Sequence, residues 1–234
     1  MAFAHNRLTD VIIPDSVLNI GSSAFVYNRL ATVTVSEGVT AIGLGAFAYN
    51  KLEKVTLPNS VAYIGPQAFY SNLLTRIIFP AGITKIGMEV FANNRLTDII
   101  IPCGVADIEM AAFANNKLSR VVLPSSLSVI GQSVFWNNLL AEIYIPGNVV
   151  VIGVAAFAHN LLTGVTVPDS VIYIGSEAFY GNNITDITIG ENVALGLGSI
   201  GDTFPHGFDG FYREHGSRAG VYTFDGYRWN AEFR

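Results

Sequence analysis

Residues 46–65 read AFAYNKLEKVTLPNSVAYIG, and residues 156–175 read AFAHNLLTGVTVPDSVIYIG. The two stretches share the order of their apolar residues, an asparagine, a proline and a final glycine. The pattern recurs every 22 residues, and each repeat is marked by one phenylalanine: Phe3, Phe25, Phe47, Phe69, Phe91, Phe113, Phe135, Phe157 and Phe179. A period of this length predicts a solenoid in which each repeat forms one turn of a coil.

One repeat indicates how its turn is built. Val55 and Leu57 alternate with polar residues as in a strand, and Pro58 ends the strand because proline has no N–H to donate. We therefore predict one short strand for each turn. The glycine that follows, Gly65 in this repeat, is expected to adopt a positive φ. The asparagine three residues after each phenylalanine is expected to form a ladder that satisfies backbone groups of the turns.

A single turn cannot bury its own apolar side chains. Stacked turns can, because their apolar side chains then form one continuous core beside paired parallel strands. The sequence therefore predicts a right-handed, curved repeat solenoid with a parallel β-sheet, built mostly from strands and loops. Residues 1–200 are predicted to form this solenoid, with eight full repeats and a degenerate ninth.

Residues 201–234 are predicted to form a small aromatic-rich β-hairpin cap. The segment 204–234 holds nine aromatic residues, and Asp225-Gly226 between two apolar runs is a signal for a two-residue hairpin turn. A cap would cover the core that the last turn of a solenoid leaves open. An alternative is that the aromatic side chains form a carbohydrate-binding surface.

Composition excludes several classes of partner. The chain has 234 residues, with 13 Lys and Arg against 18 Asp and Glu, and a net charge of −5. We therefore expect no nucleic-acid partner, since that needs clustered cations. No apolar run has the ~20 residues of a membrane-spanning helix, so we expect no membrane insertion. The only cysteine, Cys103, excludes an intrachain disulfide.

No group of residues has the pattern of a catalytic site, so we expect no enzyme activity, no catalytic residue and no cofactor. His5 and His159 occupy equivalent positions seven repeats apart and are too distant to act together. His206, His215, Asp202 and Asp209 form the one cluster with metal-binding side chains, but their spacing matches no established ligand pattern, so no metal site is expected.

The residue nine positions after each phenylalanine is expected to point outward from the concave face of the sheet. In the middle of the chain four such residues form an apolar stripe: Ile78, Ile100, Val122 and Tyr144. Beside it, seven positions after the phenylalanine, lies a charged border: Arg76, Asp98, Arg120 and Glu142.

An apolar surface with a polar rim is typical of an interface, and we predict that these eight residues bind a partner. The stripe is self-complementary across a two-fold axis, so the partner is either another protein or a second copy. The strand preference of Ile and Val is an alternative explanation.

The repeat resembles the BspA-like family of bacterial leucine-rich-repeat proteins, whose units are similar to AFxxNxLTxVxIPxSVxxIG. Ala46 to Gly65 and Ala156 to Gly175 match closely, whereas Ser36 and Gly190 replace the proline. The resemblance implies a non-enzymatic module for protein interaction or adhesion, with a host protein among the possible partners. It also implies a location at the cell envelope or outside a bacterium, although no signal peptide opens this sequence. A self-associating structural protein is an alternative.

Overall fold

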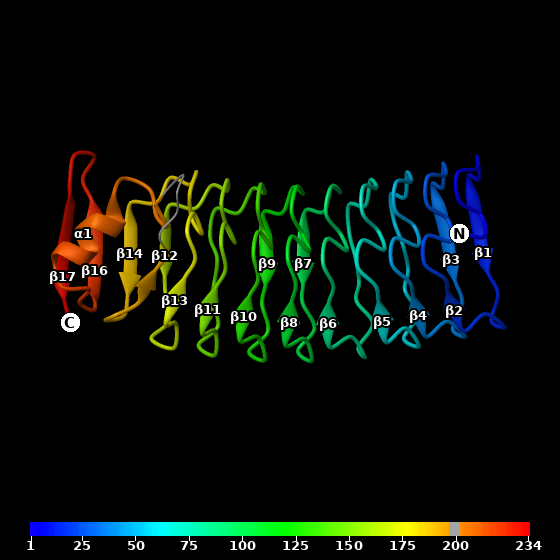
Figure 1. Ribbon diagram of the computed structural model, residues 1–234, viewed down its shortest axis with the longest axis horizontal. Coiled ribbons are helices and arrows are strands. Elements are labelled where there is room, and N and C mark those ends of the chain that lie inside the picture. The colour runs from blue at the N-terminus through cyan, green and yellow to red at the C-terminus, as the bar shows by residue number, and fades with distance from the viewer. Residues whose placement is uncertain (197–201) are drawn as a thin grey trace.

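The computed structural model describes residues 1–196 and 202–234. The described chain winds along one long axis in turns of 22 residues, as the predicted solenoid does (Figure 1). Each turn contributes a segment to one row of strands and a second segment to another row. Parallel pairing joins equivalent residues, such as Asp10 with Thr32 and Tyr63 with Ala41.

The first row contains the predicted strands, which follow the leucine of each repeat. Its members are β1 (Asp10–Ile13), β3 (Thr32–Val35), β7 (Asp98–Ile100), β9 (Arg120–Val122), β12 (Gly164–Thr166) and β14 (Asp186–Ile189). The segments 54–57, 76–79 and 142–145 lie in this row without regular strand pairing, apart from a bridge between Thr34 and Thr56.

A second row of very short strands was not predicted. It comprises β2 (Asn19–Ile20), β4 (Ala41–Ile42), β5 (Tyr63–Ile64), β6 (Lys85–Ile86), β8 (Asp107–Ile108), β10 (Val129–Ile130), β11 (Val151–Ile152), β13 (Tyr173–Ile174) and β15 (Ala194–Leu195). Each strand has two residues, the second of which is an isoleucine or leucine that points inward. The prediction covered the strand that starts each repeat, and the segment before the glycine is an additional one that also pairs from turn to turn.

The repeated glycine does not have the positive φ that we predicted. Its role is close packing: a Cβ atom at Gly175 would lie 2.4 Å from the backbone nitrogen of Val154 in the preceding turn. Positive φ occurs instead two residues after most of the phenylalanines, as at Tyr49 (56°) and Asn115 (55°), and two residues before most of them, as at Gln67 (56°). The turns bend sharply at these corners rather than at the glycine.

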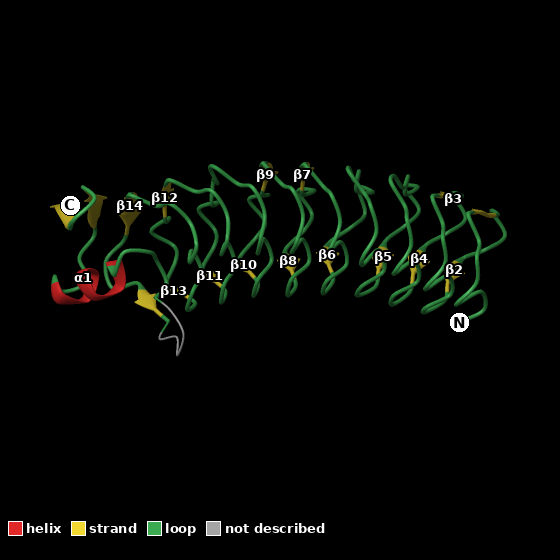
Figure 2. Cartoon of the chain, turned by 90° about the horizontal axis from the view of Figure 1, so that it is seen from above, coloured by secondary structure: helices red, strands yellow, loops and turns green. Residues whose placement is uncertain are grey.

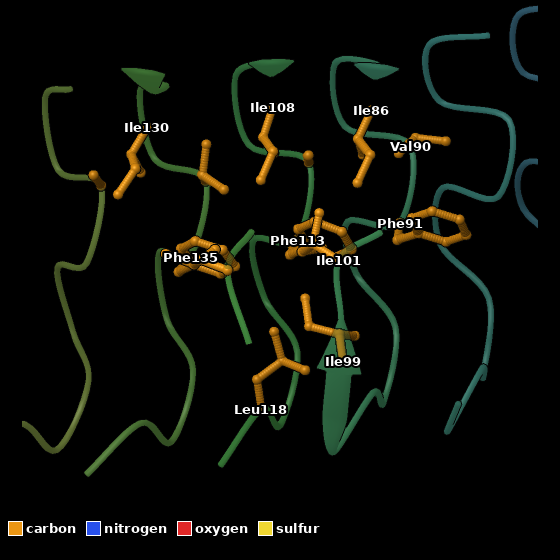
Figure 3. Close-up of a cluster of buried hydrophobic side chains, with 14 of the residues drawn as sticks. Ile86, Val90, Phe91, Ile99, Ile101, Ile108, Phe113, Leu118, Ile130 and Phe135 are labelled. Carbon is orange, nitrogen blue, oxygen red and sulfur yellow. The ribbon is translucent and has the colours of Figure 1, made fainter. Parts of the chain in front are cut away.

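Two ladders run through the interior. The phenylalanine rings stack from turn to turn, with centroids 5.8 Å apart both for Phe91 and Phe113 and for Phe113 and Phe135 (Figure 3). The asparagines from Asn28 to Asn182 are buried and hydrogen-bonded to backbone groups of their own and the preceding turn, which confirms the predicted ladder. No described buried polar side-chain atom lacks a hydrogen-bond partner.

The coil is only slightly bowed, and Figure 2 shows the row with β7 and β9 along the outer side of the bow. The stripe therefore does not lie on a concave face, contrary to the prediction. Extended strands form both rows, so successive turns have similar spacing on the two sides and no wider side forces a strong curve.

The cap consists of α1 (Phe208–Glu214), β16 (Gly220–Phe224) and β17 (Trp229–Phe233). Strand β16 pairs antiparallel with β14, and Phe204 stacks on Phe179 at 4.8 Å to continue the ladder. The hairpin loop has four residues, 225–228, instead of the predicted two, because Phe224 pairs with Trp229. Helix α1 was not predicted. The predicted domain boundary between residues 200 and 201 lies outside the described residues.

Candidate interaction surface

The stripe residues point into solvent from the first row of strands. The exposed fractions are 66% for Ile78, 64% for Ile100, 38% for Val122 and 78% for Tyr144. Their neighbours in the chain, such as Ile99 and Ile101 beside Ile100, are buried in the core. The alternation of a strand thus brings four large apolar side chains onto one face, where neighbouring turns are about 4.8 Å apart.

The charged border runs parallel to the stripe. Arg76, Asp98, Arg120 and Glu142 are all exposed, and their charges alternate from turn to turn. Among the described residues no ion pair within 4.0 Å involves any of the four. Their charged groups therefore remain available to a partner.

A shallow, open depression of about 710 Å³ lies at one end of the stripe. Its lining includes Arg120, Glu142, Tyr144, Gly164, Thr166 and Asp186. Gly164 occupies a position of the border column where most turns carry a longer side chain, so the surface is hollowed there. The sequence signal for this hollow is a glycine between Glu142 and Asp186 in the column, and the hollow was not predicted.

The aromatic residues of the cap are used mainly for packing. Phe204, Phe208, Tyr212, Tyr222 and Trp229 are buried. The most exposed aromatic residues of the cap are Tyr227 (96%) and Phe233 (38%). The tail therefore lacks the broad exposed aromatic surface on which the carbohydrate-binding alternative depends.

The side chains considered for metal binding have other contacts. His206 stacks on Phe224 at 4.4 Å, and His215 stacks on Phe211 at 4.1 Å. The buried carboxylate of Asp209 accepts hydrogen bonds from the backbone N–H groups of residues 203 and 204. Burial raises the pKa of this carboxyl, and the hydrogen bonds oppose that rise. In residues 1–196 and 202–234 no three metal-ligating side chains gather into a potential ion site.

The other candidates for chemistry are isolated. His5 and His159 lie on different turns near opposite ends of the coil, and Cys103 is an exposed free thiol. Within the described ranges, none of the helices has the length and apolar character to cross a membrane.

Stacked parallel turns of 22 residues define a solenoid of the leucine-rich-repeat class. The sequence matches the family model described as BspA type Leucine rich repeat region (6 copies) twice, at residues 1–118 and at residues 84–196. The chain therefore belongs to the BspA-type leucine-rich-repeat family. The sequence has no match among curated proteins.

Solved structures with the same fold come from several bacteria. A leucine-rich repeat protein from Bacteroides ovatus is 26% identical, with a TM-score of 0.59 over 79% of this chain and 58% of that one. A leucine-rich repeat protein from Eubacterium ventriosum is 26% identical, with a TM-score of 0.53 over 80% of this chain and 49% of that one.

The pneumococcal vaccine antigen PcpA is 23% identical, with a TM-score of 0.50 over 79% of this chain and 63% of that one. This chain thus spans less than two thirds of the length of each of the three proteins.

Proposed function

We propose that the chain is a non-enzymatic protein-interaction module of a bacterial surface or secreted protein, and that the stripe and its charged border form the docking surface. The observation that carries this proposal is the exposure of four large apolar side chains on consecutive turns. Water-exposed apolar surface of this kind, rimmed by polar and charged side chains, is the usual mark of a binding face.

The strand-preference alternative explains less of the pattern. Thr34, Thr56, Thr166 and Thr188 occupy the same column in other turns and suit a strand equally well. The change to Ile, Val and Tyr in four central turns lowers solubility without adding to the buried core. A binding role supplies a reason for that change.

The family and the related structures support the location and the class of partner. Membership in the BspA-type family implies a surface location, and PcpA is described as a pneumococcal vaccine antigen. We therefore place the module at the cell envelope or outside the cell, with adhesion to a host or bacterial protein as its role.

Affinity capture tests the docking surface. Immobilised wild-type protein is expected to retain a specific protein from host or bacterial extracts, and Ile100→Asp is expected to reduce that retention at least tenfold because a carboxylate would enter the apolar contact. Ile172→Asp is the matched control, since Ile172 is 62% exposed and lies outside the stripe. Equal retention by both variants would remove the stripe from the function.

A further inference from the structure

The exposed column that contains the stripe has a symmetric order about its centre. The centre lies between β7 and β9, where Ile100 pairs with Val122. Moving outward by one turn in each direction gives these further matches: Ile78 with Tyr144, Thr56 with Thr166, and Thr34 with Thr188. Val221 in β16 pairs with Thr188 and therefore extends the column by one position beyond the last turn. Its match at the other end of the column is Ile12. In every matched pair of this column, both residues are apolar or both are threonine.

The charged column follows the same symmetry with opposite charges. Asp98 matches Arg120, and Arg76 matches Glu142. Further out, Lys54 matches Gly164 and Thr32 matches Asp186. No position in this column is matched with a residue of like charge.

We propose that the partner of the stripe is a second copy of this chain, related by a two-fold axis that is parallel to the strands and passes between β7 and β9. Such an axis reverses the order of turns but keeps the strand direction, so each column faces itself in reverse. Every residue then lies opposite its match. This inference rests on the proposed function, because it names the partner of the same docking surface.

The depression at Gly164 fits this arrangement. Lys54 of the second copy would lie opposite Gly164, where the surface is hollowed and the carboxylates of Glu142 and Asp186 lie on either side. The long cationic side chain of Lys54 would thus enter a hollow that is flanked by two carboxylates. The same contact forms twice in the dimer, once for each copy.

The shape and size of the face indicate a reversible dimer. The whole face, ten turns at about 4.8 Å with strand segments of about 13 Å, measures on the order of 600 Å² per copy, and the bow limits the contact to the central part of that area. The area buried in the dimer is therefore below the ~1,200 Å² at which standard-size interfaces begin, as in weak and transient complexes. Because the face lies on the outer side of the bow, the closest approach falls on the four central apolar turns (Figure 2).

A charge exchange between copies tests the geometry. Arg76 and Glu142 are three turns apart in one chain, about 14 Å, which exceeds the ~8 Å screening length at physiological salt. Arg76→Glu and Glu142→Arg are each expected to weaken the wild-type dimer at least tenfold, because each places like charges opposite each other. An equimolar mixture of the two variants is expected to recover the dimer, since opposite charges then meet at both positions.

Sedimentation velocity over a broad concentration series provides the measurement, with Arg95→Glu and Glu214→Arg as charge-matched controls at exposed positions outside both columns. The controls are expected to dimerise like the wild type. A monomeric wild type at every concentration, or a mixture that stays monomeric, would overturn the proposal. If the wild type is monomeric and Ile100→Asp still abolishes capture of a foreign protein, the docking surface stands and only the second copy is refuted.

Discussion

The side-chain nitrogen of Asn116 lies 3.0 Å from the backbone oxygen of Phe91, a residue of the preceding turn. The same nitrogen donates to Phe113 of its own turn at 3.0 Å, and the Asn116 oxygen accepts the N–H of Leu96 at 3.0 Å. The nitrogen also donates to Ala114 at 3.3 Å, so one buried amide bonds to four backbone groups and joins two turns. The same arrangement recurs at each buried asparagine of the column.

Asn116→Asp tests this connection with almost no change of shape. A carboxylate cannot donate, so the carbonyls of Phe91 and Phe113 each lose one of two amide donors and keep only Asn94 and Asn138, respectively. The substitution also buries a charge, and we expect a loss of about 2–4 kcal/mol in the free energy of unfolding. Urea unfolding followed by circular dichroism measures it. The neighbouring half-buried Asn115, changed to Asp, is the control and should lose less than about 0.5 kcal/mol. Equal stabilities of the two variants would contradict the role of the ladder.

Gly175→Ala is expected to destabilise the coil by about 1–3 kcal/mol, because the new Cβ atom would press on the backbone of the preceding turn. Gly21 is the matched control, since a Cβ atom there has nothing within 4 Å. Thermal unfolding of Gly175→Ala and Gly21→Ala distinguishes a need for close packing from a need for the backbone conformation of glycine. A similar loss at both positions would indicate that glycine is needed for its backbone conformation instead of for close packing.

Phe204→Ala is expected to destabilise the cap by about 3–5 kcal/mol, because the ring is fully buried between Phe179 and Phe208. Binding of a hydrophobic dye should increase as the last turn of the core becomes exposed. Tyr227→Ala, at a side chain that is 96% exposed, should leave both measurements unchanged. An unaltered Phe204→Ala protein would show that the cap does not seal the core.

Alkaline pH should loosen the cap through Tyr222. Burial raises the pKa of this phenol to about 12, whereas an unfolded tyrosine has a pKa of about 10. A raised pKa means that the stabilisation is complete below about pH 10 and is lost as the pH rises from about 10 to about 12.

The urea midpoint reported by fluorescence of the buried Trp229, in a Trp136→Phe background, should fall over that range. Tyr222→Phe should show a smaller fall, and an identical pH profile for both proteins would contradict the assignment.

The repeated columns made most of the fold predictable. Phenylalanine and asparagine recur with one fixed spacing, and stacked turns leave only the interior for a phenylalanine column. The exposure of Ile100 followed from strand alternation, because Ile99 and Ile101 had to face the core. These predictions depended on periodicity alone, and periodicity is visible without coordinates.

Features that depend on packing between turns were not predictable in the same way. A strand of two residues, such as Tyr63–Ile64, carries too little alternation to be recognised. The need for Gly175 arises from the neighbouring backbone and not from its own conformation. The seven-residue helix α1 contains Gly210, and contacts of Phe208 and Tyr212 with Tyr222 in β16 hold it in place and outweigh its weak helix propensity.

The asparagine amides join each turn only to its neighbour, and this has a mechanical consequence. A force that pulls the two ends apart along the axis would detach turns one at a time, because these hydrogen bonds connect only adjacent turns. Each detached turn frees 22 residues, which extend by about 70 Å. A protein built in this way would lengthen stepwise under tension and would recoil when released, so it would absorb a sudden pull between two surfaces.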